Sequence, residues 1–465
     1  MTRTAVINVV GLTDRLIGPN TPNINAFAQK GRLTHINPVV PAVTCTAQST
    51  YLTGLPPSQH GVVGNGWYNR ELAEVQFWKQ SNHLVEGRKL WEEMRAAQPS
   101  FICAKLFWWY NMYSTADYSI TPRPMYPADG RKVFDIYTHP FSIHHEIKRD
   151  LGEFPFPTFW GPAAGRQTPQ GSPSATSEWI AESAKWIEQK HQPTLSLIYL
   201  PHLDYNLQRL GPDNPAIADD CRAIDRIVGG LIDFFRGRNV QVLLLAEYGI
   251  TPVNRPIHLN RLFRQQGWLA IKNELGLELL DAGASKAFAV ADHQVAHIYF
   301  NDAAIEKAAR DLVSHTPGVA RVLGRSEQAG LGLDHPRSGD LIALAEENTW
   351  FTYYYWLNDA LAPDFARTVD IHRKPGYDPV ELFLDPKLKF PKLKIAAKLL
   401  RKKLGFRMLM DLIPLDATLV KGSHGIRPAD VRDFPVLISQ SANLTPRETI
   451  DAPEVYSILK AHITA

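Results

Sequence analysis

Residues 43–61, VTCTAQSTYLTGLPPSQHG, follow a strand-like apolar run and carry several hydroxyl side chains, beginning with Thr44. This layout is typical of a turn from a strand into a helix. Free backbone N–H groups at a helix N-terminus stabilise anionic oxygens, so a Thr hydroxyl at this place is suited to attack a phosphoryl group. Taken alone, the stretch favours a simpler role for Thr44, that of a helix N-cap.

Apolar strand-like runs alternate with helical patterns along the chain, as in AVINVV, LSLIYL and VQVLLLA. This alternation predicts a parallel sheet covered by helices. Ligands of such sheets bind at the carboxyl ends of the strands. Thr44, Asp204 and Glu247 each follow a strand-like run. These three residues therefore form a candidate site without reference to any family.

The segment around Thr44 resembles the nucleophile segment of the alkaline phosphatase superfamily, in its type I phosphodiesterase and nucleotide pyrophosphatase branch. Five further segments resemble landmarks of that branch in the same order: TPNINAFAQKG at 21–31, HLDYNLQRLGPD at 202–213, AEYGIT at 246–251, HPRSGDLIALA at 335–345 and GSHGIRPAD at 422–430. The resemblance implies a three-layer α/β/α fold with a mainly parallel central sheet and an inserted cap region.

The domain division follows from length, because 465 residues exceed what one hydrophobic core usually supports. We expect the α/β core to comprise residues 1–285 and 411–465, and the cap to comprise residues 286–410. Two stretches rich in Trp, Tyr, Phe and Pro, 108–130 and 154–162, are expected to form pocket walls.

The metal ligands of the family match this chain only in part. The family pattern holds two divalent ions with a first-strand Asp, the nucleophile, an Asp and a His four residues apart, an adjacent Asp-His pair and a late His. Thr44, Asp204 and His424 stand where the pattern places them. The departures are Val10, Gln208, Glu247 and Tyr248. Val cannot ligate, Gln ligates weakly, Tyr must first ionise, and only Glu keeps a hard anionic oxygen.

The resemblance still implies one or two divalent ions, held by Thr44, Asp204, Glu247 and His424. Zinc, magnesium and manganese are the candidate metals, and the oxygen-rich ligand set favours the last two.

Two other segments carry ligand-type side chains. Asp370 and His372, in DIHRKPGYDPVE at 370–381, alternate along the chain and can point the same way. They are either additional metal ligands or part of a turn with Asx bonding. The segment ADHQVAH at 291–297 precedes the apolar IYF, which favours a strand with histidines at its edge.

Four residues are predicted to contact the substrate: Asn65, Gln208, Arg209 and Tyr248. Asn65 can donate to a phosphoryl oxygen, and the alternative is a turn residue beside Gly66. Arg209 can steer an anionic substrate inward.

The predicted function is metal-dependent hydrolysis of a phosphodiester, pyrophosphate or phosphonate through a phospho-Thr44 intermediate. Two alternatives stay open. The losses at Val10 and Gln208 are compatible with a protein that has lost turnover and binds an anionic metabolite or partner. Transfer to an alcohol in place of water would make the protein a transferase. The sequence contains no P-loop and no GxGxxG motif, so it gives no support to an NTPase or a dinucleotide-dependent enzyme.

Residues 387–407 hold nine Lys and Arg and no acidic residue, and without them the net charge of +3 becomes negative. As a helix, this segment meets an anionic membrane surface or a lipid-linked substrate, or it docks on the cap by its leucines. No nucleic-acid module accompanies the charge, so we expect a phosphorylated small molecule and no nucleic acid as the partner. The start MTRTAVINVV has no signal-peptide pattern, and the three cysteines form no disulfide framework, which predicts a cytoplasmic protein.

Overall fold

The computed structural model describes residues 1–169, 171–406, 408–445 and 447–465. Its largest sheet has nine strands in the order β21-β2-β20-β9-β1-β8-β5-β6-β7. Their bounds are β1 (Thr4–Val9), β2 (Arg32–Asn37), β5 (Cys103–Leu106), β6 (Tyr118–Pro122), β7 (Ile136–His139), β8 (Leu195–Leu200), β9 (Gln241–Leu245), β20 (Val436–Ser439) and β21 (Thr449–Asp451). The neighbours from β9 to β6 all pair in parallel, whereas β7 and β20 run antiparallel to their neighbours. The prediction of a mainly parallel sheet is confirmed.

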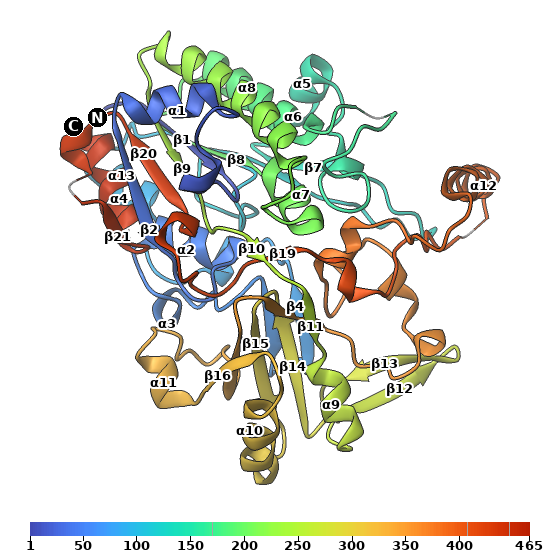
Figure 1. Ribbon diagram of the computed structural model, residues 1–465. Coiled ribbons are helices and arrows are strands. Elements are labelled where there is room, and N and C mark those ends of the chain that lie inside the picture. Colours follow the sequence, from blue (N-terminus) through green and yellow to red (C-terminus); the bar gives the residue numbers. More distant parts are fainter. Residues whose placement is uncertain (170, 407, 446) are drawn as a thin grey trace.

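The central strands are almost continuously apolar because helices cover both faces of the sheet. Every residue of β1 and β8 is buried, as expected for strands inside a doubly covered parallel sheet. One group of helices that contact each other comprises α1 (Pro22–Gln29), α6 (Ala175–His191) and α8 (Ile217–Arg236). The other comprises α2 (Thr44–Thr53), α4 (Leu90–Ala97) and α13 (Glu454–Thr464). Figure 1 shows the strands between the two groups, and the predicted three-layer fold is confirmed.

A second, smaller sheet is antiparallel and has the order β14-β15-β17-β16. It is built from β14 (Ala287–Asp292), β15 (Val295–Phe300), β16 (Val319–Leu323) and β17 (Leu341–Ala345), and lies with α9 (Leu259–Gln265), α10 (Glu306–Ser314) and α11 (Arg325–Ala329) in the lower part of Figure 1. The hydrophobic cluster of this region reaches from Val253 to Val420 and includes Tyr68 and Phe77. The predicted cap, residues 286–410, falls inside that span, and its boundaries stay a prediction.

The remaining elements are short or connect the two sheets. They are α3 (Pro57–His60), α5 (Ser142–Leu151), α7 (His202–Leu210), α12 (Pro391–Lys403), β3 (Gly66–Asn69), β4 (Glu74–Phe77), β10 (Thr251–Pro252), β11 (Arg255–Ile257), β12 (Ala270–Glu274), β13 (Leu277–Asp281), β18 (Thr349–Phe351) and β19 (Gly422–Ser423). Across the described part of the chain, no helix is both long and apolar enough to cross a membrane.

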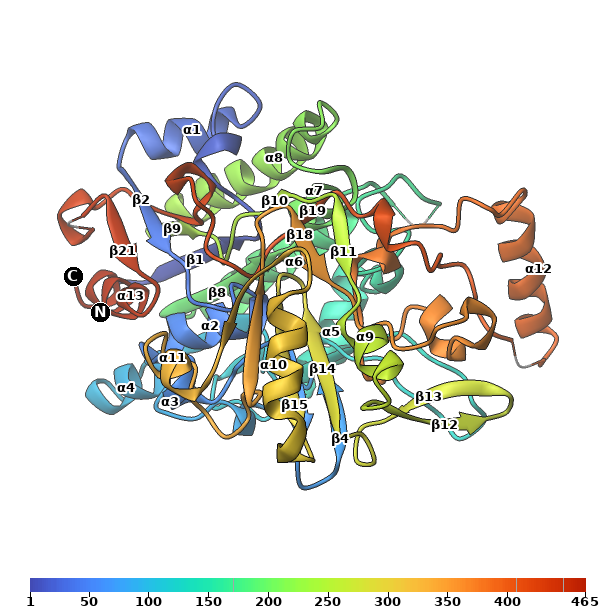
Figure 2. The same cartoon turned by 60° about the horizontal axis from the view of Figure 1, so that its bottom comes forward.

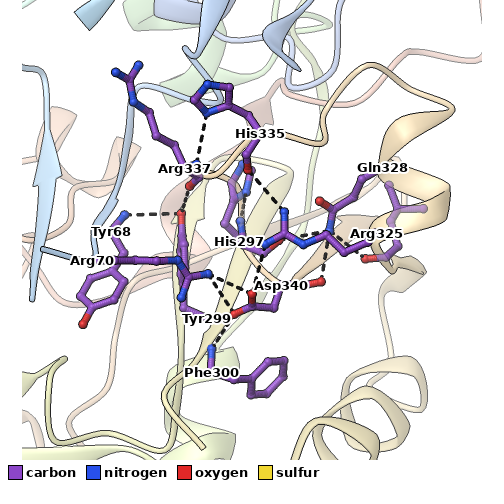
Figure 3. A network of polar contacts seen from close by, with 12 residues as sticks. Tyr68, Arg70, His297, Tyr299, Phe300, Arg325, Gln328, His335, Arg337 and Asp340 are labelled. Atoms are coloured by element: carbon purple, nitrogen blue, oxygen red, sulfur yellow. Dashed lines mark hydrogen bonds and ion pairs between the residues drawn. The ribbon is translucent and has the colours of Figure 1, made fainter. Parts of the chain in front are cut away.

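A polar network joins the small sheet to the segment that follows α2 (Figure 3). His297, on β15, accepts a hydrogen bond from Gly339 N–H at 3.0 Å on its Nδ1 atom and bonds the Val63 carbonyl through Nε2 at 2.9 Å. Arg337 donates to the carbonyls of Gly61 and Leu84 at 2.8 and 2.6 Å. The segment 335–345 thus fixes the small sheet beside the chain that leaves the Thr44 helix.

Candidate active site

Thr44 is the first residue of α2, at the turn that the sequence predicts. Val43 precedes it with extended backbone angles, φ −133° and ψ 158°, and occupies the N-cap position. All ten residues of the helix are buried. The Cys45 N–H donates to Asn65 Oδ1 at 3.0 Å, which ties the start of the helix to the chain before β3. Thr44 therefore lies one position inside the helix, where its hydroxyl is not used as a cap.

The Thr44 hydroxyl belongs to a chain of three hydrogen-bonded groups. Its Oγ1 atom lies 3.3 Å from the Tyr248 hydroxyl oxygen, and the Tyr248 hydroxyl donates to Asp204 Oδ1 at 3.2 Å. A phenol has one hydrogen to donate. Since Tyr248 gives that hydrogen to Asp204, the Thr44 hydroxyl is the donor to Tyr248. Asp204 lies in the first turn of α7, after β8, and Tyr248 follows β9, so three segments meet at one edge of the sheet.

These groups line a partly open cavity of about 40 Å³. Its described lining residues are Thr44, Asn65, Trp78, Trp109, Phe159, Trp160, Tyr199, Pro201, Asp204, Tyr205, Gln208, Tyr248, His293, Ile371, Tyr377 and His424. One water needs roughly 10–15 Å³ of such space, so the cavity has room for a small group such as the phosphoryl end of a larger ester. Trp109, Phe159 and Trp160 come from the two stretches expected to form pocket walls.

Burial sets the protonation of the two carboxyl groups. It raises the pKa of Asp204 to about 7, against the opposing effect of the hydrogen bond from Tyr248. It also raises the pKa of Glu247 to about 8, although the side-chain amides of Gln48 and Asn8 both donate to Glu247 Oε1. Near pH 7, Asp204 is divided between its two protonation states and Glu247 is mainly neutral.

His424 is held as a neutral imidazole against the ring of Tyr248. Burial lowers the pKa of His424 to about 3, and its Nδ1 atom bonds the Ala42 carbonyl at 2.7 Å. The two rings are parallel, with centroids 3.7 Å apart and an interplanar angle of 1°. Burial also raises the pKa of Tyr248 well above 10, so this phenol keeps its hydrogen.

The residues present do not fit a divalent metal ion. No group of three or more His, Cys, Asp or Glu side chains is arranged to hold one, as far as the described residues go. A neutral phenol, Tyr248, connects Thr44 to Asp204, the two oxygen ligands that the family pattern retains. Glu247 is bound by amide donors, and Val10 is a fully buried apolar residue. The departures therefore leave Thr44, Asp204 and His424 from the donor set of the family pattern, which together offer one carboxylate and one imidazole.

Several predicted site residues lie outside the cavity lining. Asp370 accepts hydrogen bonds from Tyr126 at 2.7 Å and from Lys132 at 3.2 Å. His372 bonds the Trp78 carbonyl at 3.3 Å and stacks on Trp109, behind the cavity wall. The segment 370–381 forms a wall of the pocket through Ile371 and Tyr377, and the ligand role of Asp370 and His372 stays a prediction.

The predicted substrate contacts divide into two groups. Gln208 and Tyr248 line the cavity, as does Asn65, whose amide already donates to Asp292 and Tyr377 at 3.2 and 3.0 Å. Arg209 does not belong to the described lining. It donates to the carbonyls of Leu382 and Ala164 at 3.0 and 2.7 Å and is 3% exposed. Its buried guanidinium therefore links the two segments that contain these residues.

His293 lines the cavity, although its segment favoured a strand with edge histidines. It occupies the tight turn between β14 and β15, with φ 57°, and its ring centroid lies 3.9 Å from that of His424. Its Nε2 atom bonds the Tyr377 hydroxyl at 2.9 Å, whereas its Nδ1 atom and the Tyr205 hydroxyl have no hydrogen-bond partner among the described residues. The sequence signal that could have placed His293 in a turn is the polar stretch ADHQ between two apolar runs, because this pattern predicts a hairpin.

The raised pKa of Glu247 predicts a pH-dependent effect of Glu247→Gln on stability. A folded-state pKa of about 8, compared with 4.5 as the ordinary value, means that the folded protein binds the proton more tightly than the unfolded chain. This contribution to stability is complete below about pH 4.5 and is lost as the pH rises through about 8. Gln cannot ionise, so the variant's melting temperature should rise relative to wild type across this range. Glu448→Gln, at an exposed position, is the control, and a difference for Glu247→Gln that is constant with pH would contradict the assignment.

Comparisons with known proteins agree with this architecture. The family model of type I phosphodiesterase / nucleotide pyrophosphatase matches residues 4–378. A pyrophosphatase/phosphodiesterase of Schizosaccharomyces pombe, described as uncharacterized, is 25% identical over 271 residues, which cover 56% of this chain and 47% of that protein. The chain thus spans about half the length of this curated relative.

Solved structures show the same fold at low sequence identity. Murine ectonucleotide pyrophosphatase / phosphodiesterase 5, as an inactive variant in complex with AMP, has a TM-score of 0.58 at 13% identity, covering 100% of this chain and 95% of that one. Phosphonoacetate hydrolase from Sinorhizobium meliloti 1021, in complex with phosphonoformate, has a TM-score of 0.59 at 13% identity, covering 100% and 96%. The name of the matching family agrees with the predicted class, phosphoric ester hydrolase. The chain belongs to the type I phosphodiesterase / nucleotide pyrophosphatase family of the alkaline phosphatase superfamily.

Proposed function

We propose that the protein hydrolyses phosphodiesters, with the Thr44 hydroxyl as the group that accepts the phosphoryl centre. The observation that carries the proposal is the directed chain of hydrogen bonds from Thr44 through Tyr248 to Asp204 at the start of α2. The fold is shared with a phosphodiesterase that binds AMP and with a phosphonate hydrolase, which supports an anionic phosphorus compound as the substrate class.

The hydrogen-bond chain supplies a route for the proton that Thr44 must lose. Thr44 Oγ1 forms a bond to phosphorus while the bond from phosphorus to the leaving alcohol oxygen breaks. The Thr44 proton passes to Tyr248 as the Tyr248 proton passes to Asp204, and the alkoxide takes a proton from water. Water then attacks the phosphorus of phospho-Thr44 while its proton passes to the hydroxide left by the first step. The bond from phosphorus to Thr44 Oγ1 breaks, and the proton on Asp204 returns through Tyr248 to restore the Thr44 hydroxyl. A base with a pKa near the working pH is best suited to this task, and the pKa of Asp204 is raised to about 7.

The charge of the cavity favours a phosphodiester over a phosphomonoester. The described lining residues include neither Lys nor Arg, and both histidines have lowered pKa values. A buried anion without a paired cation is costly, and the cost grows with its charge. A diester carries one negative charge at neutral pH, whereas a monoester carries nearly two. The Cys45 N–H at the start of α2 is already bound by Asn65, so the helix offers the single charge mainly the positive end of its dipole.

The protonation of Asp204 predicts the pH dependence of the reaction. The carboxylate form of Asp204, which acts as the base, becomes populated as the pH rises through about 7. The value of kcat/KM for bis(4-nitrophenyl) phosphate, measured with a chelator present, should therefore rise with pH and level off above about 7. In Asp204→Asn this rising limb should disappear and the rate should fall by about 10²–10⁴-fold. A wild-type profile that is flat from about pH 5 to about pH 9 would contradict the role of Asp204.

One observation favours a second function, binding without turnover. The site offers neither a cationic side chain in its described lining nor a donor set that fits a metal, so the charge that develops on phosphoryl oxygens has little stabilisation. Under this alternative, bis(4-nitrophenyl) phosphate or AMP raises the melting temperature of the protein while no product forms with or without added zinc, magnesium or manganese. Product formation that depends on Thr44 separates the two functions.

A further inference from the structure

Helix α12 extends away from both sheets, on the right of Figures 1 and 2. Leu393, Leu400 and Leu404 are 68%, 58% and 65% exposed. With 3.6 residues per turn, positions separated by seven and four residues lie on the same side of a helix. Leu393 and Leu400 therefore form one outward-facing stripe, which Leu404 continues directly after the helix, and these leucines do not dock the helix on the protein.

The opposite side of α12 is attached to the chain that follows it. Lys394 lies 3.2 Å from Asp411 Oδ2, and Lys398 pairs with the same carboxylate and donates to the Leu409 carbonyl. On a helix these two lysines point about 100–140° away from the Leu393 direction. The ion pairs thus hold the helix with its leucine stripe turned to solvent.

Aromatic and cationic side chains extend this surface on both sides. Phe390 and Phe406, which flank the helix, are 72% and 60% exposed. Four cations of the segment are exposed as well: Lys387, Lys389, Arg401 and Lys403. The sequence 386–406 contains no acidic residue. Residue 407, the last of the predicted basic segment, lies outside the described residues.

Exposed apolar side chains that share one face of a helix indicate an interaction site, and the cations beside them indicate the kind of partner. We propose that α12 and its flanks, residues 387–406, bind the surface of an anionic lipid bilayer. Leu and Phe enter the boundary between headgroups and acyl chains, and the cations contact acidic headgroups, as in interfacial amphipathic helices. A protruding convex helix with cations beside its stripe suits a flat anionic surface. The contact goes beyond the proposed hydrolysis and does not depend on Thr44.

Vesicle co-sedimentation tests this surface in the full-length protein. The wild type should sediment with vesicles of phosphatidylcholine mixed with phosphatidylserine but not with phosphatidylcholine alone, and added salt should weaken the binding. The double variant Leu393→Gln/Leu400→Gln should reduce the apparent affinity by about tenfold or more. The matched control is Leu275→Gln, because Leu275 is a fully exposed leucine in the turn between β12 and β13. It should bind as the wild type does.

Three results would overturn the proposal. They are equal binding to both vesicle types, binding by the double variant equal to wild type, and no binding by the wild type. Sedimentation velocity without lipid tests the alternative that the leucine stripe binds a second copy of this chain. A wild-type dimer that the leucine substitutions dissociate would assign the stripe to self-association instead. Melting temperatures of all variants should match wild type, since the substituted side chains are exposed.

Discussion

Thr44→Ala is expected to reduce phosphodiester hydrolysis to the rate in buffer, and Tyr248→Phe is expected to reduce kcat/KM by about 10²–10⁴-fold. Alanine removes the atom that bonds to phosphorus. Phenylalanine keeps the ring that stacks on His424 but removes the hydroxyl that connects Thr44 to Asp204. The measurement is steady-state hydrolysis of bis(4-nitrophenyl) phosphate by protein treated with a chelator.

A substitution at another buried tyrosine serves as the control that distinguishes the loss of proton transfer from general structural effects. Tyr299 is fully buried, lies outside the cavity lining, and donates its hydroxyl to the Arg337 carbonyl at 2.8 Å. Tyr299→Phe removes this bond and the one that the Tyr299 hydroxyl accepts from the Tyr68 N–H at 3.4 Å, so it should cost about 1–3 kcal/mol of stability and leave kcat/KM unchanged. If Tyr248→Phe and Tyr299→Phe had the same activity, Tyr248 would have no part in proton transfer.

The largest effect on stability is expected from Lys374→Met, at a cost of about 3–5 kcal/mol in the free energy of unfolding. Lys374 and Glu381 form an ion pair in which the side chains are 1% and 2% exposed. Glu381 also accepts a hydrogen bond from the Trp160 indole at 3.2 Å. Removing the ammonium group leaves a carboxyl buried without its cation. The same loop carries the cavity residues Ile371 and Tyr377, so the substitution should also loosen this wall.

Urea unfolding monitored by circular dichroism measures this effect. The surface pair Lys185 and Glu182 provides the control, because it has the same ionic chemistry with side chains 26% and 55% exposed. Lys185→Met should change stability by no more than about 0.5 kcal/mol. The double variant Lys374→Met/Glu381→Leu should recover much of the loss, since no buried charge remains. Equal costs for Lys374→Met and Lys185→Met would show that burial does not govern the pair.

Local pattern was sufficient to predict the elements that carry the site. The runs of β1, β8 and β9 are mostly apolar, with single polar residues such as Asn8 and Ser196 inside them, so the parallel sheet and the position of its carboxyl edge could be predicted from periodicity. Asp204 follows β8 closely, Thr44 begins α2 seven residues after β2 ends, and the structure brings the two together through Tyr248.

Residues on long connections could not be placed in this way. Asp370 has the spacing of a ligand, but its direction depends on Tyr126 and Lys132, which are more than two hundred residues away in sequence. His293 reaches the cavity because the hairpin of β14 and β15 packs against the segment that follows α2. Both positions are set by tertiary packing, and no local period encodes that packing.

Detection of phospho-Thr44 tests the central claim most directly. Chelator-treated protein is mixed with bis(4-nitrophenyl) phosphate, quenched in acid and digested, and the peptide that contains residues 43–53 is examined by mass spectrometry. We predict a phosphoryl or nitrophenyl-phosphoryl adduct on Thr44 in the wild type and a much smaller amount in Tyr248→Phe. An adduct that forms only after zinc, magnesium or manganese is added, or turnover without any adduct on Thr44, would contradict metal-free attack by Thr44 with proton transfer through Tyr248 to Asp204.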